Sequence, residues 1–475
     1  MKRRPPRKAA RAAAPSRTQR LPEAVQTLSI DRIAAGGDGV GRVDGLAVFV
    51  PRTAPGDVAQ VAYVTHARHG RGRILQLLTP SPHRVAPSCV HYERDRCGGC
   101  QLQHLDADAQ QAARRQIVQD TVQRIGRREI PLPTLDTGES WGYRSRLTLT
   151  LRRSGARWIG GLHAHDDPTR VFALETCLIA HPALVSAWGS IRSLLRQGTL
   201  SLPAVPDERA GAPSLRLSLR LDGDIGANAT ADPAERGVQV VIEGGSVWPQ
   251  QAEWTEAVRR ADARVQGVWW TPSVTGDAGA ATRRDQPGPV ADYLPQAREA
   301  LAFAQVNAAI AARLRDMVFE AVQQLAPMRV LDGYAGTGLL AERLALSGVP
   351  VVAVEADAVG AESAAARLAQ AGDAGSRSRV VCDLMERAVA APDMAVDVVL
   401  LNPPRRGVHA DVTSWLESPA QRRVRGVVYV SCDPATLARD LARLPSWRVE
   451  RVHCFDMFPQ TAHVETVCVL HRENA

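Results

Sequence analysis

Two side chains near the end of the chain have the chemistry of a nucleophile and a base. Cys432 follows the apolar run Val428–Val430 and precedes Pro434. Because proline stops the strand there, we expect the thiol at the rim of a sheet rather than inside a core. This position favours a reactive thiol over a small buried hydrophobe. Glu465 leads into the apolar run Thr466–Leu470 and could act as a general base, although an exposed charge is the simpler interpretation of a lone glutamate.

A glycine-rich turn between a predicted strand and a predicted helix could hold a cofactor. The turn reads Asp-Gly-Tyr-Ala-Gly-Thr-Gly, and its glycines let the backbone approach a ligand closely. The next predicted strand ends at Glu355, whose carboxylate could bind the hydroxyls of a ribose. The pattern suits a dinucleotide or S-adenosylmethionine. The candidate cofactor-binding residues of the turn are Asp332, Tyr334, Gly336 and Gly338.

Two further polar residues follow predicted strands of the same region. Asp383 could hold an adenine amine, or it could cap the helix that follows. Asn402 begins an Asn-Pro-Pro-Arg-Arg segment whose two prolines fix a rigid loop. Its amide offers both a donor and an acceptor, and the arginines suit phosphate or base contacts. A simple strand-ending turn is the alternative for this segment.

Four cysteines could be the ligands of a metal site. Cys89, Cys97 and Cys100 lie close together in sequence, with Gly98-Gly99 allowing a tight loop, and Cys177 follows after a long gap. Four thiolates suit either a [4Fe–4S] cluster or structural zinc, and the spacing alone does not choose between the two.

The bulk composition is that of a globular protein with a basic leader. The chain has 475 residues, 45% hydrophobic and 23% charged. It has no secretory signal and no apolar run long enough to span a bilayer, so we expect a cytoplasmic protein. We also expect a monomer. Residues 1–22 carry eight Lys and Arg and no acid, which equals the formal net charge of +8. This Pro- and Ala-rich tail is predicted to be disordered. It could be a phosphate-binding arm or a leader that only increases solubility.

The elements that must position these residues change along the chain. After a tail over 1–23, residues 24–80 read as short strands with glycine turns, typical of a small OB-like barrel. Residues 81–295 hold the cysteines and mixed strands and helices, with a polar helix at Asp106–Ile125. Residues 296–475 alternate strands and helices, which predicts a doubly wound α/β domain with a parallel sheet.

Together these segments resemble the RNA 5-methyluridine methyltransferase family, whose members modify 23S ribosomal RNA or transfer RNA. Residues 24–80 look like its RNA-binding TRAM domain, and Gly142–Arg146 looks like its Gly-Tyr-Arg-x-Arg strand. Phe303–Asn307 is similar to its Phe-x-Gln-x-Asn helix start, where Gln305 would face the cofactor or the target base. Phe458–Glu465 is similar to its Phe-Pro-x-Thr-x-His-x-Glu motif.

The resemblance implies roles for these residues. Cys432 would be the nucleophile, in a Ser-Cys-Asp-Pro that is usually Ser-Cys-Asn-Pro, and Glu465 would be the general base. The four cysteines would hold a [4Fe–4S] cluster in a central α+β domain. S-adenosylmethionine would bind a C-terminal Rossmann-like methyltransferase domain, with Asn402 near the uracil. Attack by the thiolate on carbon 6 makes carbon 5 nucleophilic toward the methyl group, and the base must leave its stack to react.

The chain departs from the family pattern in three places. Asn402 stands where an Asp is usual, and an amide accepts from a uracil N3–H more weakly than a carboxylate does. Gly333-Tyr334-Ala335 replaces a bulky residue, Phe and Cys, and Ala311 replaces a second Asn. The alternatives are therefore an RNA amino-group methyltransferase that uses Asn-Pro-Pro, or a decayed protein that only binds RNA. A dehydrogenase is weaker, because nothing else supports nicotinamide chemistry.

Overall fold

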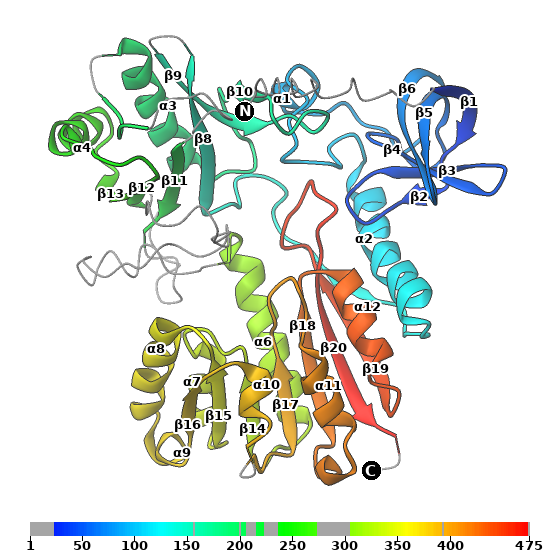
Figure 1. Cartoon of the computed structure of the whole chain (residues 1–475), viewed down its shortest axis with the longest axis vertical. Helices are drawn as coiled ribbons and strands as arrows, with labels where there is room; N and C mark the ends of the chain where they lie inside the picture. The colour runs from blue at the N-terminus through cyan, green and yellow to red at the C-terminus, as the bar shows by residue number, and fades with distance from the viewer. Residues whose placement is uncertain are drawn as a thin grey trace, which may run out of the picture. The chain divides into compact units, whose positions relative to one another are not determined.

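The computed structural model describes residues 23–154, 157–198, 201–205, 215–222, 236–272, 305–391 and 394–473 (Figure 1). Residues 1–22 of the predicted tail, and Phe303 and Ala304 of the predicted helix start, lie outside these ranges. The chain divides into two units, one of residues 1–32 and 38–82 and one of residues 33–37 and 83–475.

The N-terminal unit is a strand-rich module, as predicted from its glycine turns. Its sheet has the order β1-β5-β6-β4-β3-β2, in which β4 and β6 pair in parallel and the other registered pairs are antiparallel. The hairpin between β3 and β4 turns at Asp44 and Gly45, which both have positive φ, as a tight hairpin turn requires. Alternate strand residues, among them Val48, Val50 and Val61, fill a small core. The strands are β1 (Ala24–Ser29), β2 (Arg32–Ile33), β3 (Gly39–Val43), β4 (Leu46–Val50), β5 (Val58–His66) and β6 (His69–Thr79).

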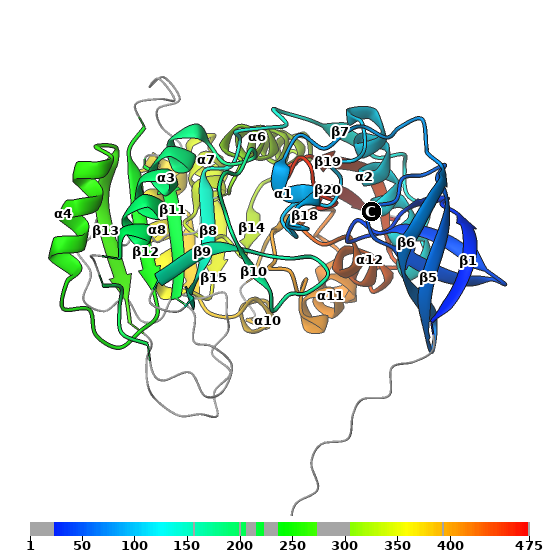
Figure 2. The ribbon, with the colours of Figure 1, turned by 90° about the horizontal axis from the view of Figure 1, so that it is seen from above.

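The central part of the second unit is a six-stranded sheet with the order β10-β9-β8-β11-β12-β13. Helices α3 (Pro182–Gln197) and α4 (Gln251–Ala261) pack on it (Figure 2). Their buried tryptophans Trp188 and Trp254 share a core with every second residue of β8. The strands are β8 (Arg146–Ser154), β9 (Arg157–His163), β10 (Val171–Ala173), β11 (Leu215–Leu221), β12 (Val238–Glu243) and β13 (Val265–Thr271).

The C-terminal part is the predicted doubly wound sheet. Its order is β16-β15-β14-β17-β18-β20-β19-β7, and the first five strands are parallel. The strand order reverses between β14 and β17, and in such folds ligands bind beyond the carboxyl ends of the strands at this switch point. The strands are β14 (Val330–Gly333), β15 (Val351–Glu355), β16 (Arg379–Cys382), β17 (Val398–Leu401), β18 (Gly426–Ser431), β19 (Trp447–Phe455) and β20 (Glu465–Arg472).

Helices cover both faces of this sheet (Figure 1), because successive strand residues point to opposite sides. Val330 packs with one set of helices and Leu331 with the other. The first set is α6 (Ala308–Gln324), α7 (Leu339–Leu346), α8 (Ala358–Ala369) and α9 (Gly372–Ser376). The second set is α10 (Met385–Ala388), α11 (Ala410–Glu417) and α12 (Pro434–Ala442), joined by α2 (Ala107–Thr121) and η1 (Val122–Gly126).

Two elements from the range 81–295 therefore belong to the C-terminal sheet. Val118 and Val122, at the end of α2 and in η1, are fully buried in the core beneath α12. Strand β7 (Thr134–Asp136) pairs in parallel with β19 and becomes the edge strand. Asp106 caps the N-terminus of helix α2, because its carboxylate accepts the Ala109 N–H. Tertiary packing, rather than position along the chain, decides where these elements lie.

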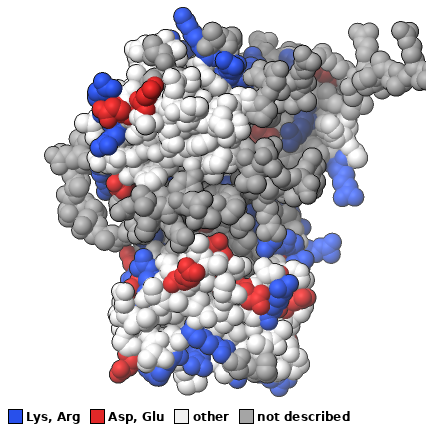
Figure 3. Space-filling model, turned by 60° about the vertical axis from the view of Figure 1, so that its left-hand side comes forward, with Lys and Arg blue, Asp and Glu red and all other residues white. Residues whose placement is uncertain are grey.

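One face of the described surface has mixed charge. Figure 3 shows one face on which Lys and Arg side chains are interspersed with Asp and Glu. In the part of the chain that the structure describes, no helix combines the length and the apolarity that crossing a membrane requires.

Candidate active site and cysteine cavity

The glycine-rich turn after β14 has the backbone geometry of a ligand-binding loop. Tyr334, Gly336 and Gly338 all have positive φ, of 63°, 56° and 80°. Glu355, at the end of β15, accepts the Gly336 N–H with Oε2 at 2.8 Å and the Asp357 N–H with Oε1 at 2.8 Å. The carboxylate predicted for a ribose therefore also fixes the turn. Gly338 allows α8 to pack closely, since a Cβ there would lie 2.7 Å from the Cα of an α8 residue.

Asp332 is a buried carboxyl without a complete set of partners. It is 2% exposed, and its Oδ2 makes no hydrogen bond within the described residues. Burial, with a smaller contribution from the charge of Glu355, raises its pKa to about 7. Such a group is able to accept a hydrogen bond from a ligand at the switch point.

The other two strand-end residues lie at the same edge. Asn402 follows β17, its side chain is exposed, and its N–H donates to the Gly333 carbonyl at 3.2 Å. Asp383 follows β16, accepts the adjacent Leu384 N–H at 2.7 Å, and lies 3.6 Å from Arg387. The helix-cap interpretation of Asp383 is wrong, because Leu384 occupies the N-cap position of α10.

The structure brings Cys432 and Glu465 together. Strands β18 and β20 are antiparallel with Ser431 opposite Thr466, so Cys432, just after β18, comes opposite Glu465, the first residue of β20, at the end of these strands. The Glu465 charge accordingly acts on the Cys432 thiol. Cys432 is half-buried, as expected for a thiol at the rim. Glu465 is only 5% exposed, so the interpretation of it as an ordinary surface charge is wrong.

The electrostatics of this pair are those of a coupled acid and base. Burial raises the pKa of Glu465 to about 7, and Arg405 opposes the rise. Burial also raises the pKa of Cys432 to about 11; the Glu465 charge adds to the rise and Arg405 opposes it. A glutamate that titrates near neutral pH suits proton transfer. Because the Glu465 charge disfavours the thiolate, the pair favours states in which one of the two groups is ionised and the other is protonated.

The segment around Gln305 joins the central sheet to the C-terminal domain. Gln305 is half-buried, and the next residue, Val306, accepts the Ser145 N–H at 2.8 Å. Asn307 caps α6 by accepting the Ile310 N–H at 3.3 Å. The Asn307 side chain is 3% exposed, and its Nδ2 makes no hydrogen bond within the described residues. Asn307 is a candidate binding residue, although in sequence it stands out only as part of the Phe-x-Gln-x-Asn motif. An Asn just before a helical run is a signal for a helix N-cap.

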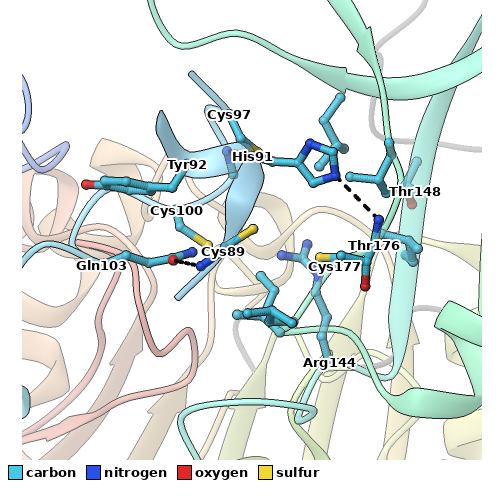
Figure 4. A pocket seen from close by; sticks show the side chains of 16 residues that line it. Cys89, His91, Tyr92, Cys97, Cys100, Gln103, Arg144, Thr148, Thr176 and Cys177 are labelled. Atoms are coloured by element: carbon cyan, nitrogen blue, oxygen red, sulfur yellow. Dashed lines mark hydrogen bonds between the residues drawn. The ribbon is translucent and has the colours of Figure 1, made fainter. Parts of the chain in front are cut away.

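The four predicted cysteine ligands surround one cavity. Cys89, Cys97, Cys100 and Cys177 line a cavity of about 180 Å³, together with Arg144, Tyr92 and apolar side chains. Figure 4 shows how these side chains lie. All four thiols are free. Burial and the charges of the other three cysteines raise the pKa of Cys100 to about 12, although a hydrogen bond with Gln103 opposes the rise. Four thiolates would repel one another in so apolar a cavity unless a cationic centre compensated their charge.

Hydrogen bonds fix the segments that carry these cysteines. His91, fully buried beside the cavity, accepts the Glu175 N–H at 3.0 Å and the Thr176 N–H at 3.4 Å through Nε2. These two bonds tie α1 (Val90–Glu93) to the segment that ends at Cys177. Across the described ranges, no group of three or more His, Cys, Asp or Glu side chains has the arrangement expected around a metal ion.

Comparison with known proteins identifies the modules. Residues 293–473 match the family model of tRNA (uracil-5-)-methyltransferase, and residues 19–69 match that of the TRAM domain. A solved structure, the Pyrococcus abyssi tRNA (uracil-54, C5)-methyltransferase in complex with S-adenosyl-L-homocysteine, covers 93% of this chain and 100% of its own, with a TM-score of 0.63 and 20% identity. The fold is therefore similar to that of this methyltransferase over nearly the whole chain.

Sequence relatives narrow the class. The 23S rRNA (uracil(1939)-C(5))-methyltransferase RlmD of Chromohalobacter salexigens is 32% identical, over 99% of this chain and 95% of its own. The RlmD of Thiobacillus denitrificans is 31% identical, over 94% and 99%. An uncharacterized RNA methyltransferase of Thermosynechococcus vestitus is 31% identical, over 93% and 97%. The chain belongs to the RNA uracil-C5 methyltransferase family, which confirms the predicted resemblance.

Proposed function

We propose that the protein transfers a methyl group from S-adenosylmethionine to carbon 5 of a uridine in RNA through a covalent adduct with Cys432. The observation that carries this proposal is the meeting of Cys432 and the buried Glu465 at the sheet edge that also carries the glycine-rich turn. A thiol beside a carboxyl that titrates near neutral pH supports addition to a pyrimidine and removal of its proton.

The turn residues would hold the methyl donor. The positive-φ backbone at Tyr334, Gly336 and Gly338 leaves room for the methionine part, while Glu355 binds the ribose and Asp383 the adenine amine. The Asp332 Oδ2, which makes no hydrogen bond within the described residues, would offer an acceptor to the charged donor. The donor supplies an electrophilic methyl group on sulfur.

The reaction divides between two side chains. The Cys432 sulfur bonds to carbon 6 of the uracil, and the electron pair of the 5,6 double bond moves toward carbon 5 and the carbonyl oxygen. Carbon 5 then bonds to the methyl carbon, whose bond to sulfur breaks. Glu465 takes the carbon-5 proton, the double bond re-forms, and the bond between Cys432 and carbon 6 breaks. Arg405, whose charge lowers the pKa of both groups, favours the thiolate at the start. Gln305 and Asn402 would position the base.

We favour 23S ribosomal RNA as the substrate over transfer RNA. The two RlmD relatives match nearly the whole chain at 31% and 32% identity, whereas the solved transfer-RNA enzyme is 20% identical. The TRAM-like module supports RNA as the partner. Free cysteines throughout the described residues fit a reducing compartment, the cytoplasm.

We further propose that the four cysteines hold a [4Fe–4S] cluster. Their common cavity, the apolar lining and the four free thiols support this donor set. A four-iron cluster spreads its ligands over four metal atoms, so its thiols need not converge as they do around a single ion. Bound there, the cluster would link the Cys89–Cys100 segment to the segment of Cys177. Anaerobic purification should yield about four irons and four sulfides per chain. Cys177→Ser should lower that content, and Cys382→Ser, at an exposed cysteine, should not.

The activity test uses labelled S-adenosylmethionine and total RNA from a strain that lacks 5-methyluridine. We expect labelled 5-methyluridine by mass spectrometry, none with Cys432→Ala, and wild-type labelling with Cys382→Ala as the control. Label on an exocyclic amine that survives Cys432→Ala would instead support the amino-group methyltransferase. RNA binding without label would support a protein that only binds RNA.

A further inference from the structure

The loop that leads to Glu465 is held by residues that adjoin the cysteine cavity in sequence. This loop, residues 456–464, connects β19 to β20, and Gln460 lies at its centre with a φ of 70° and 6% exposure. The Gln460 carbonyl accepts two N–H groups, from Gln101 at 3.1 Å and from Leu102 at 3.0 Å. Gln101 and Leu102 follow Cys100 directly, so the end of the cysteine segment is bonded to the centre of the loop.

A second contact comes from Tyr143, the neighbour in sequence of the cavity-lining Arg144. The Tyr143 hydroxyl donates to the Pro459 carbonyl at 3.0 Å. The Tyr143 ring packs in the same apolar cluster as Cys89, Cys100 and Cys177. Burial raises the pKa of Tyr143 well above its ordinary range, so its hydroxyl stays a donor at any working pH.

Helix α2 makes the third set of contacts with the loop. Gln110, 6% exposed, donates to the Gln460 Oε1 at 3.0 Å and to the Leu105 carbonyl at 3.0 Å. Arg114 donates to the Gln110 Oε1 at 3.2 Å and forms a buried ion pair with Asp456 at 3.2 Å. The side chains of Asp456, at the start of the loop, and of Gln460, at its centre, are thus held by one buried network.

From these contacts we infer that Tyr143 and Gln460 are positioning residues, through which occupancy of the cysteine cavity fixes the loop carrying Glu465. The inference rests on the proposed roles of Glu465 and of the four cysteines. Gln460 occupies a motif position that admits any residue, so its role comes from the contacts alone. Losing the cluster would release the cysteine segment and Tyr143, and the loop would lose three of its hydrogen bonds together.

The decisive measurement is amide hydrogen exchange of the full-length protein under anaerobic conditions, with the cluster loaded and after iron chelation. The reporters are the amides of Gln101 and Leu102, which bond to Gln460, and those of Thr461 and His463 within the loop. We expect at least about tenfold faster exchange of these amides after chelation, because losing a single net hydrogen bond already gives roughly that factor and three are lost together. Unchanged exchange in Thr461 and His463, with faster exchange at Cys89–Cys100, would overturn the inference.

Point variants of the loaded protein separate this coupling from general unfolding. Tyr143→Phe removes only the hydroxyl that reaches Pro459, and we expect about five- to tenfold faster loop exchange with unchanged iron content. Tyr63→Phe is the matched control, because Tyr63 is a buried tyrosine of β5 that packs in the core of the N-terminal unit. Faster loop exchange in Tyr63→Phe equal to that in Tyr143→Phe would contradict a specific contact.

Activity provides a second readout. With Tyr143→Phe we expect kcat to fall about tenfold with an unchanged KM for S-adenosylmethionine, and methylated RNA to remain attached to the protein, because Glu465 removes its proton late. An equal fall in donor affinity would contradict a positioning role. If the wild-type protein forms no 5-methyluridine, the proposed function fails, and the exchange measurement still decides whether the cavity fixes the loop.

Discussion

Replacing Glu465 by Gln should stabilise the free protein, and the gain should grow with pH. Glu465 is 5% exposed, and burial raises its pKa from the usual 4.5 to about 7. The folded state therefore holds a proton on this group between these two values, whereas the unfolded state has already released it. Stability contributed by this group falls as pH rises from 4.5 through 7 and levels off above, because ionising the buried carboxyl costs free energy.

The magnitude follows from the same shift. A rise of the pKa from 4.5 to about 7 corresponds to about 3 kcal/mol at pH above 8, as an upper value for so buried a group. Gln has the same shape and does not ionise. The difference in unfolding free energy between Glu465→Gln and wild type should therefore increase by about 2–3 kcal/mol between pH 5 and pH 8.5.

Urea unfolding at pH 5, 7 and 8.5 under anaerobic conditions measures this difference. Other buried carboxyls, such as Asp332 and Asp456, contribute to both proteins and cancel in the comparison. Glu473→Gln, at an exposed residue just beyond β20, is the control and should show no such trend. A Glu465→Gln difference that stays constant with pH would refute the claim that the active-site carboxyl is buried at a cost in stability.

Three other predictions follow from single contacts. Asn402→Asp should raise kcat/KM for uridine-containing RNA about two- to tenfold, since a carboxylate accepts an N–H more strongly; an unchanged or lower value would exclude contact with the base. Gly338→Ala should lower stability by more than 2 kcal/mol in thermal unfolding and weaken donor binding in calorimetry, because its Cβ would meet α8 at 2.7 Å. The control Gly348→Ala, also at positive φ but with nothing within 4 Å, should cost about 1 kcal/mol; equal losses would show that only φ matters. Arg114→Met should destabilise by about 3 kcal/mol because it leaves a buried carboxylate alone, and adding Asp456→Asn should recover part of that loss; additive losses in the double variant would contradict the pair.

The sequence by itself determined the features that depend on local chemistry. The strand, turn and helix around Asp332–Gly338 follow from glycines at positive φ between an apolar run and a helical run, and the structure has them there. Pro434 after Cys432 ends β18 and leaves the thiol half-buried at the rim. Such signals are read within a few residues, so no knowledge of distant contacts is needed.

Only the tertiary structure decided which distant residues meet. The burial of Glu465 comes from its pairing beside Cys432 across β18 and β20, and a lone glutamate in sequence carries no sign of it. Helix α2 lies far before the C-terminal domain in sequence, yet it packs beneath α12 and places Gln110 against Gln460. Burial and long-range hydrogen bonds depend on the packing of whole elements, and they set both the pKa of the base and the anchoring of its loop.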